Sequence, residues 1–129
     1  MKILLWIVSI LGITVTSTAL GASPPTPKIE HAVVVHFAYG SRDLTRLFAL
    51  EKKLEAAIAK AGVGEYDGNE VAVDGSDGYL YMYGPDADRL FEVVKPILQS
   101  TPFMHGATAK KRYGPPSDGV KESVVVINP

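Results

Sequence analysis

Two copies of one short phrase constrain the fold of this chain more than any other feature. The segment from Tyr39 reads YGSRDLTRLF, and the segment from Tyr83 reads YGPDADRLF. In both copies an aspartate, Asp43 or Asp86, stands three residues before Arg-Leu-Phe. Glycine ends a strand, aspartate accepts hydrogen bonds from the free N–H groups of a first helical turn, and Leu-Phe begins a buried stripe. The repeated phrase therefore predicts two junctions at which a strand passes into a helix.

The segments around these junctions show helical or extended periodicity. Extended segments are expected at 31–39, 70–73, 79–83, 106–113 and 120–127, and helices at 44–61 and 87–99. In both helical segments apolar residues recur with the spacing of a stripe that covers a core, and the first helix is expected to stop at Gly62. The sequence DGSDG supplies the glycines of a reversal, so the second and third strands are expected to form a hairpin.

The order of these segments is β-α-β-β-α-β with one further strand. It predicts an α+β fold of the ferredoxin-like split βαββαβ type, with one antiparallel sheet, two helices on one face and an extra C-terminal edge strand. The first and third strands run antiparallel in such a sheet, so the two junctions lie at its opposite ends. The aspartates and arginines of the two copies therefore do not form one catalytic site. Helix capping is their expected role, and an anion site at a helix N-terminus near Arg42 and Arg46 is the alternative.

The N-terminal segment has the layout of a secretory signal. Lys2 precedes an apolar run over 3–15, and small residues follow before the proline-rich SPPTP. We expect a signal peptide at 1–22, a proline-rich linker at 23–29 and a single α+β domain at 30–129. An uncleaved membrane anchor is the alternative, because no charged residue occurs between Lys2 and Lys28. In either case the domain is predicted to lie outside the cytoplasm, periplasmic or secreted.

Composition and spacing remove several classes of function. The chain has 13 basic and 14 acidic residues, a balance that argues against binding to a nucleic-acid backbone. It has no cysteine, which excludes disulfides, thiolate metal sites and cysteine nucleophiles. The acidic segment DGNEVAVDGSDG does not match the ligand spacing of an EF-hand loop. His31 and His36 are five residues apart on one strand and so face opposite sides, and we expect no metal and no cofactor.

Local catalytic motifs are missing as well. The sequence contains no G-x-S-x-G, S-x-x-K or H-E-x-x-H. A catalytic site assembles in space, so an enzyme is not excluded, but general acid–base chemistry near neutral pH would have to use one of the three histidines. An enzyme is the less favoured expectation.

One face of the predicted sheet bears a group of tyrosines. Side chains alternate along a strand, and Leu80 and Met82 are expected to point under the helices. Their neighbours Tyr79, Tyr81 and Tyr83 must then point to the uncovered side. The sequence therefore predicts an aromatic surface on the side of the sheet away from the helices.

The same alternation adds basic side chains to this surface. It sends Val34 and His36 of the first strand to the uncovered side, together with Thr108, Lys110 and Arg112 of the fourth. Tyr and Arg are enriched where protein interfaces bury surface. The predicted binding residues are Tyr79, Tyr81, Tyr83, His36, Lys110 and Arg112.

Three interpretations of this surface remain open. Tyrosines pair well across strands, so they could be structural only. A platform for stacked bases would resemble an RRM, but the aromatic-glycine strings of that domain are missing and nucleic acid is not an expected partner. The third interpretation is a face that binds a protein partner or a second copy of the chain.

We expect a small exported, non-catalytic binding domain that acts through its open sheet face on a protein partner or on itself. A periplasmic inhibitor or immunity-type protein is one concrete form. The alternative is a sheet-to-sheet dimeric enzyme or small-ligand-binding protein with a site around His36. A membrane is an expected partner only if the N-terminal segment is retained.

Overall fold

The computed structural model of the chain describes residues 30–129. They form five strands, two α-helices and one short 3-10 helix. In chain order these are β1 (His31–Ala38), α2 (Thr45–Ala61), β2 (Glu65–Val71), β3 (Asp77–Gly84), α3 (Ala87–Gln99), η2 (Pro102–Met104), β4 (Thr108–Arg112) and β5 (Glu122–Val126). The predicted signal peptide at 1–22 and the predicted linker at 23–29 lie outside the described residues.

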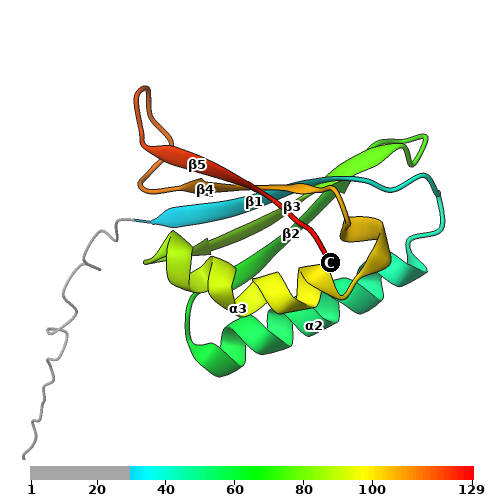
Figure 1. The fold of residues 1–129 in the computed structure, drawn as a ribbon, viewed down its shortest axis with the longest axis horizontal. Helices are drawn as coiled ribbons and strands as arrows, with labels where there is room; N and C mark the ends of the chain where they lie inside the picture. Colours follow the sequence, from blue (N-terminus) through cyan, green and yellow to red (C-terminus); the bar gives the residue numbers. More distant parts are fainter. Residues whose placement is uncertain (1–29) are drawn as a thin grey trace, which may run out of the picture.

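The strands make one antiparallel sheet in the order β2-β3-β1-β4-β5. Figure 1 shows α2 and α3 side by side beneath one face of this sheet, and no helix of residues 30–129 over the other face. The α+β class, the single antiparallel sheet and the two helices are confirmed. We call the uncovered side of the sheet the open face.

The hydrophobic core lies between the sheet and the two helices. The buried stripe of α2 consists of Leu47, Leu50, Leu54 and Ile58, and that of α3 of Ala87, Leu90, Phe91, Val94 and Leu98. Leu80 and Met82 are fully buried, which confirms that these two side chains point under the helices. No polar or charged side chain of residues 30–129 is buried. Apolar packing therefore holds the helices against the sheet.

The second strand differs from the prediction. β2 spans Glu65–Val71 and not 70–73, and Val73 lies 97% exposed in the turn that follows. A β-bulge between Tyr66 and Gly68 adds one residue to the strand. Gly68 has a φ of 138°, a conformation that favours glycine. The glycines and charges of this stretch resemble a loop in the sequence, which is why the predicted strand begins only at Glu70.

The other elements follow the prediction more closely. α3 has the predicted bounds, and α2 ends at Gly62, whose φ of 65° is the left-handed conformation of a helix C-cap. β4 and β5 are shorter than the predicted segments at 106–113 and 120–127. Strong helical periodicity located the helices well, whereas short strands lack a comparable signal at their ends.

The two copies of the repeated phrase lie at opposite ends of the sheet, as predicted. His31 of β1 pairs with Gly84 of β3, so the second junction lies beside the start of β1 and the first beside its end. Asp86 is the N-cap of α3, and its side chain accepts hydrogen bonds from Asp88 N at 3.0 Å and Arg89 N at 3.1 Å. The predicted cap is confirmed at this junction.

The first copy of the phrase makes a weaker cap. The N-cap position of α2 is Leu44, which has no side-chain hydrogen bond. Asp43, one residue earlier, accepts a hydrogen bond from Thr45 N at 3.0 Å. The hydroxyl of Tyr39 donates to the carbonyl of Asp43 at 2.5 Å and holds this turn against the end of β1. Two similar sequences thus begin their helices in different ways.

The two edges of the sheet also differ. β2 carries Glu65, Asp67 and Glu70 as well as its bulge, and charges and bulges both disfavour pairing with a further strand. β5 reads ESVVV and has no bulge. Lys121 and Ile127, the residues on either side of β5, make backbone hydrogen bonds toward the β4 side, which places the odd-numbered residues of β5 in the same orientation. The backbone groups of its even-numbered residues therefore face outward.

Candidate functional site

The open face is a grid of side chains from all five strands. Read across the sheet from β2 to β5, the first row is Glu65, Tyr83, Ala32, Arg112 and Glu122. The second row is Gly68, Tyr81, Val34, Lys110 and Val124. The third row is Glu70, Tyr79, His36, Thr108 and Val126. All six predicted site residues belong to this grid, so the structure brings them together on one surface. Their role in binding stays a prediction.

Three rings of the open face form a continuous stack. The Tyr79 ring lies 4.5 Å from the His36 ring and 6.2 Å from the Tyr81 ring, with an interplanar angle of 18° in each case. The hydroxyl of Tyr81 donates to a Glu70 carboxylate oxygen at 2.5 Å. This hydrogen bond is the main reason that the pKa of Tyr81 is raised to about 12. The stack is therefore fixed at one end by Glu70.

The histidine at the other end of the stack is also fixed. His36 Nε2 lies 2.8 Å from Asp77 Oδ2, and both side chains are about half exposed, at 45% and 46%. Within residues 30–129 no hydroxyl group is hydrogen-bonded to this imidazole. A general base that activates a nucleophile needs such a contact. The arrangement orients the His36 ring but does not pair it with a nucleophile.

A hollow of about 370 Å³ lies beside the stack. It is lined by Val34, His36, Tyr79, Thr108, Lys110, Arg112 and Glu122. Lys110 Nζ is 3.8 Å from a Glu122 oxygen, and among residues 30–129 Arg112 donates a side-chain hydrogen bond only through Nε, to Gly114 O at 2.7 Å. A guanidinium has five N–H donors. The hollow thus combines an apolar and aromatic side with a cationic side that retains hydrogen-bonding capacity.

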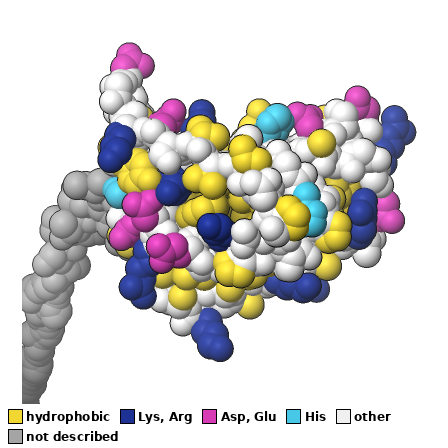
Figure 2. All heavy atoms as spheres, viewed as in Figure 1, with side chains coloured by type: hydrophobic (Ala, Val, Ile, Leu, Met, Phe, Trp, Pro, Cys, Tyr) yellow, Lys and Arg dark blue, Asp and Glu magenta, His cyan; other side chains and the backbone are white. Residues whose placement is uncertain are grey.

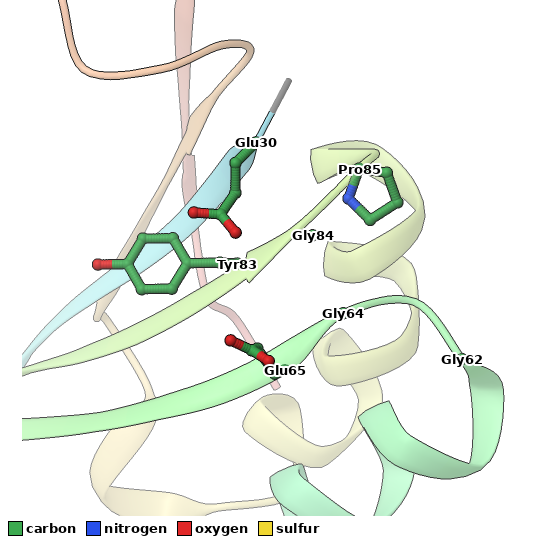
Figure 3. A pocket seen from close by; sticks show the side chains of 7 residues that line it. All are labelled: Glu30, Gly62, Gly64, Glu65, Tyr83, Gly84 and Pro85. Atoms are coloured by element: carbon green, nitrogen blue, oxygen red, sulfur yellow. The ribbon is translucent and has the colours of Figure 1, made fainter. Parts of the chain in front are cut away.

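A second hollow, of about 390 Å³, was not predicted. It lies at the end of the sheet and borders the open face through Glu65 and Tyr83 (Figure 3). Figure 3 shows the carboxylates of Glu30 and Glu65 on either side of the Tyr83 ring. Gly64 and Gly84 allow the backbones of two segments to cross closely here. This end of the open face is therefore acidic.

The acidic residues of the site were missed by sequence reasoning. Glu70, Asp77 and Glu122 contact predicted site residues, and Glu65 lies in the first row of the grid. Strict alternation back from Glu70 would place Glu65 on the helix side. The bulge reverses that assignment. A strand starting at 65, recognised together with the bulge, would have placed Glu65 and Glu70 beside the tyrosines.

The three histidines lie in separate environments. His31 Nδ1 accepts a hydrogen bond from Ala87 N at 3.0 Å, and His105 Nε2 lies 2.8 Å from Gln99 O. Within residues 30–129 no three His, Asp or Glu side chains are grouped so that they could hold a metal ion. Among the same residues no helix has the length and apolar content needed to span a bilayer.

Surface charge is mixed over the side of the molecule seen in Figure 2. Lys and Arg lie along the helix-bearing edge at the bottom, and acidic groups accompany basic ones toward the sheet. No protein-family model, curated protein or solved structure matches the sequence, so the geometry of its residues alone supports a functional proposal.

Proposed function

We propose that this chain is a non-catalytic binding domain that uses its open face to bind a protein surface, either a partner or a second copy of itself. The observation that supports this most directly is the exposure of apolar side chains on this face. Among the described residues five large apolar side chains are exposed, and Tyr79, Val124 and Val126 lie on the open face. Apolar groups beside tyrosine and arginine, on a face without covering helices, are typical of interaction surfaces.

Cross-strand packing alone explains less of this surface. It accounts for the stacked rings of Tyr79, Tyr81 and His36. It gives no reason for the hollow beside them, or for the two cations that line it. A partner that places an apolar side chain over Val34 and an acceptor near Arg112 would use both features. Binding therefore explains the open face better than a structural role does.

We also infer that the fold is the ferredoxin-like split βαβ arrangement with an added edge strand. The order β2-β3-β1-β4, with β5 outside β4, supports this inference. Export through a signal peptide at 1–22 is part of the proposal and rests on the sequence pattern. A periplasmic protein that occludes a toxic enzyme is one role of this kind. N-terminal sequencing of the chain recovered from the cell envelope tests the export, with Ser23 expected as the first residue.

A small-ligand site around His36 is the second candidate. The hollow of about 370 Å³ and the His36–Asp77 pair favour it. The engagement of Nε2 by Asp77, together with the ring of Tyr79 stacked on the imidazole, favours binding over catalysis. A ligand in this hollow would perturb the NMR signals of the His36 ring, whereas a protein bound across the whole face would perturb all three rows of the grid.

The test of the proposed function is a double variant, Tyr81→Ala with Arg112→Ala. It should lose the partner that the wild-type chain captures from its own cell envelope, or lose self-association. The matched control is Phe48→Ala with Lys52→Ala, which removes an exposed ring and a cation from α2. If the open-face variant keeps every captured partner and its oligomeric state, the proposal is wrong.

A further inference from the structure

We propose that the occupant of the open face is a second copy of this chain, related by a twofold axis that runs parallel to the strands between β1 and β3. The inference rests on the proposed function and specifies its partner. It follows from the positions of three features in the grid of the open face. These are the charged side chains, the large and small side chains, and the hollow of about 370 Å³.

Charged side chains on the open face are grouped by strand, with acidic residues on β2 and basic residues on β4. On the open face β2 contributes Glu65 and Glu70, whereas β4 contributes Lys110 and Arg112. These strands flank β3 and β1 symmetrically in the sheet. Rotation about the proposed axis lays β2 of each copy over β4 of the other and keeps each row opposite itself. Glu65 then faces Arg112 of the second copy, and this contact forms twice.

Side-chain size is complementary in the same arrangement. The tyrosine column of β3 comes to lie over the β1 column, whose members are Ala32, Val34 and His36. Tyr81 faces Val34 of the second copy and enters the hollow of about 370 Å³ beside it. Tyr79 faces His36, so the two aromatic stacks lie against each other. In the first two rows large side chains therefore meet small ones or a hollow, and in the third row a ring meets a ring.

Two other twofold arrangements are opposed by charge. An axis across the strands would lay each strand over its own copy, with carboxylates facing carboxylates on β2 and cations facing cations on β4. An axis along β1 itself would oppose Glu65 to Glu122. Like charges held together at a partly desolvated interface cost binding energy. The proposed axis avoids both conflicts.

The available area is sufficient for a reversible dimer. The proposed axis overlays four strands, β2, β3, β1 and β4, and leaves β5 outside the overlap. These strands are five to eight residues long, so at about 4.8 Å between strands and about 3.3 Å per residue the overlap is roughly 19 by 23 Å. Two such faces bury on the order of 900 Å², an area typical of weak, transient contacts. The β4–β5 turn rises above the sheet near its β5 side, so it would flank β2 of the second copy (Figure 1). We therefore expect dimerisation that depends on concentration.

Charge reversal tests this arrangement by analytical ultracentrifugation. The full chain is expressed with its N-terminal segment, and the form that the cells produce from it is purified. Wild type should sediment as a monomer–dimer mixture between 1 µM and 1 mM, on the order of the affinity expected for a small interface. Glu65→Arg and Arg112→Glu should each raise the dissociation constant at least tenfold. Glu55→Arg on α2 is the matched control and should change nothing.

An equimolar mixture of the two variants is the decisive sample. One mixed pair has the native Glu65–Arg112 contact and the other the reversed contact, so the mixture should recover the dimer. If circular dichroism shows that either variant is unfolded, the chain with both substitutions replaces the mixture and should also dimerise. A wild type that stays monomeric, a dimer that tolerates both reversals, or a mixture that stays monomeric would overturn the second copy as occupant.

The outcomes separate this inference from the proposed function. If wild type is monomeric but Tyr81→Ala with Arg112→Ala loses a captured protein, the open face binds another protein and only the second copy is wrong. If a dimer forms and neither the reversals nor the double alanine variant changes it or any captured partner, both proposals are wrong.

Discussion

Asp43 and Asp86 occupy matching positions in the repeated phrase but make different hydrogen bonds. Asp86 accepts from two N–H groups of α3, whereas Asp43 accepts from one at the start of α2. We expect Asp86→Ala to lower the free energy of unfolding by about 1 kcal/mol, the usual cost of losing a cap. Asp43→Ala should cost less. Urea titration of both variants measures the difference, and equal losses would contradict the assignment.

Gly84 is required for steric reasons and Gly62 for conformational ones. A Cβ at Gly84 would overlap the carbonyl oxygen of Val63, whereas a Cβ at Gly62 meets nothing within 4 Å. Gly84→Ala should therefore destabilise the fold by about 2 kcal/mol or more, the range of overpacking. Gly62→Ala should cost about 1 kcal/mol, because only its left-handed φ is unfavourable. Thermal and urea unfolding of the two variants measure these losses of stability. A larger loss for Gly62→Ala than for Gly84→Ala would contradict the prediction.

Asp88 should make the fold sensitive to acid. One of its carboxylate oxygens accepts from Lys111 Nζ at 2.8 Å and from the Tyr113 hydroxyl at 2.6 Å. These hydrogen bonds, that of Lys111 foremost, hold the pKa of Asp88 below its ordinary value of 3.8. A carboxyl group with a lowered pKa stabilises the folded state above the unfolded value, and this stabilisation is lost as the pH falls through the folded value.

The stability advantage of wild type over Asp88→Asn should thus be constant above about pH 5. It should shrink below pH 3.8 and disappear below the lowered pKa. Denaturant titrations of both proteins from pH 7 to pH 2 measure it. An advantage that persists unchanged to pH 2 would show that the charge of Asp88 does not contribute. High salt should reduce the effect, since the carboxylate is exposed.

At the scale of elements, the C-terminal strand tests the alternation on which the open face depends. Ile127, just after β5, is 1% exposed, whereas Val126 is 51% exposed on the open face. Ile127→Ala should cost about 2–5 kcal/mol, as for other core residues. Val126→Ala should change stability by no more than about 0.5 kcal/mol. The urea midpoints of the two variants measure the difference in stability. Similar losses for both variants would mean that the open face near β5 is covered.

Helices were predictable from this sequence because each has an apolar stripe and a clear end signal. α3 had the predicted bounds, and Gly62 ends α2. β2 was not predictable in full, since Gly68 and the surrounding charges favour a loop locally and only pairing with β3 makes the stretch a strand. The predicted site contained the tyrosines, His36 and the cations, which alternation alone places. The acidic half was missed because it lies on the bulged strand.

At the scale of the whole molecule, the described core extends from Ala32 to Ile127. A chain that begins at Glu30 should therefore unfold with the same free energy as one that begins at Ser23, within about 0.5 kcal/mol. Chemical denaturation of the two chains compares them. A loss beyond that limit would show that residues 23–29 contribute to the fold. The candidate site was less predictable than the fold, because hydrogen bonds such as His36–Asp77 join residues distant in sequence.

The unlike borders of the sheet limit how these molecules can join edge to edge. Within residues 30–129 the β5 border has unpaired backbone groups beside valines, while the β2 border is acidic and interrupted by a bulge. A chain that can pair only through its β5 edge can join one other chain in this way, and the resulting pair has no unpaired β5 edge for a third chain. If strands of neighbouring chains pair at high concentration, edge pairing by itself should stop at two chains, and a longer assembly would need the open-face contact as well.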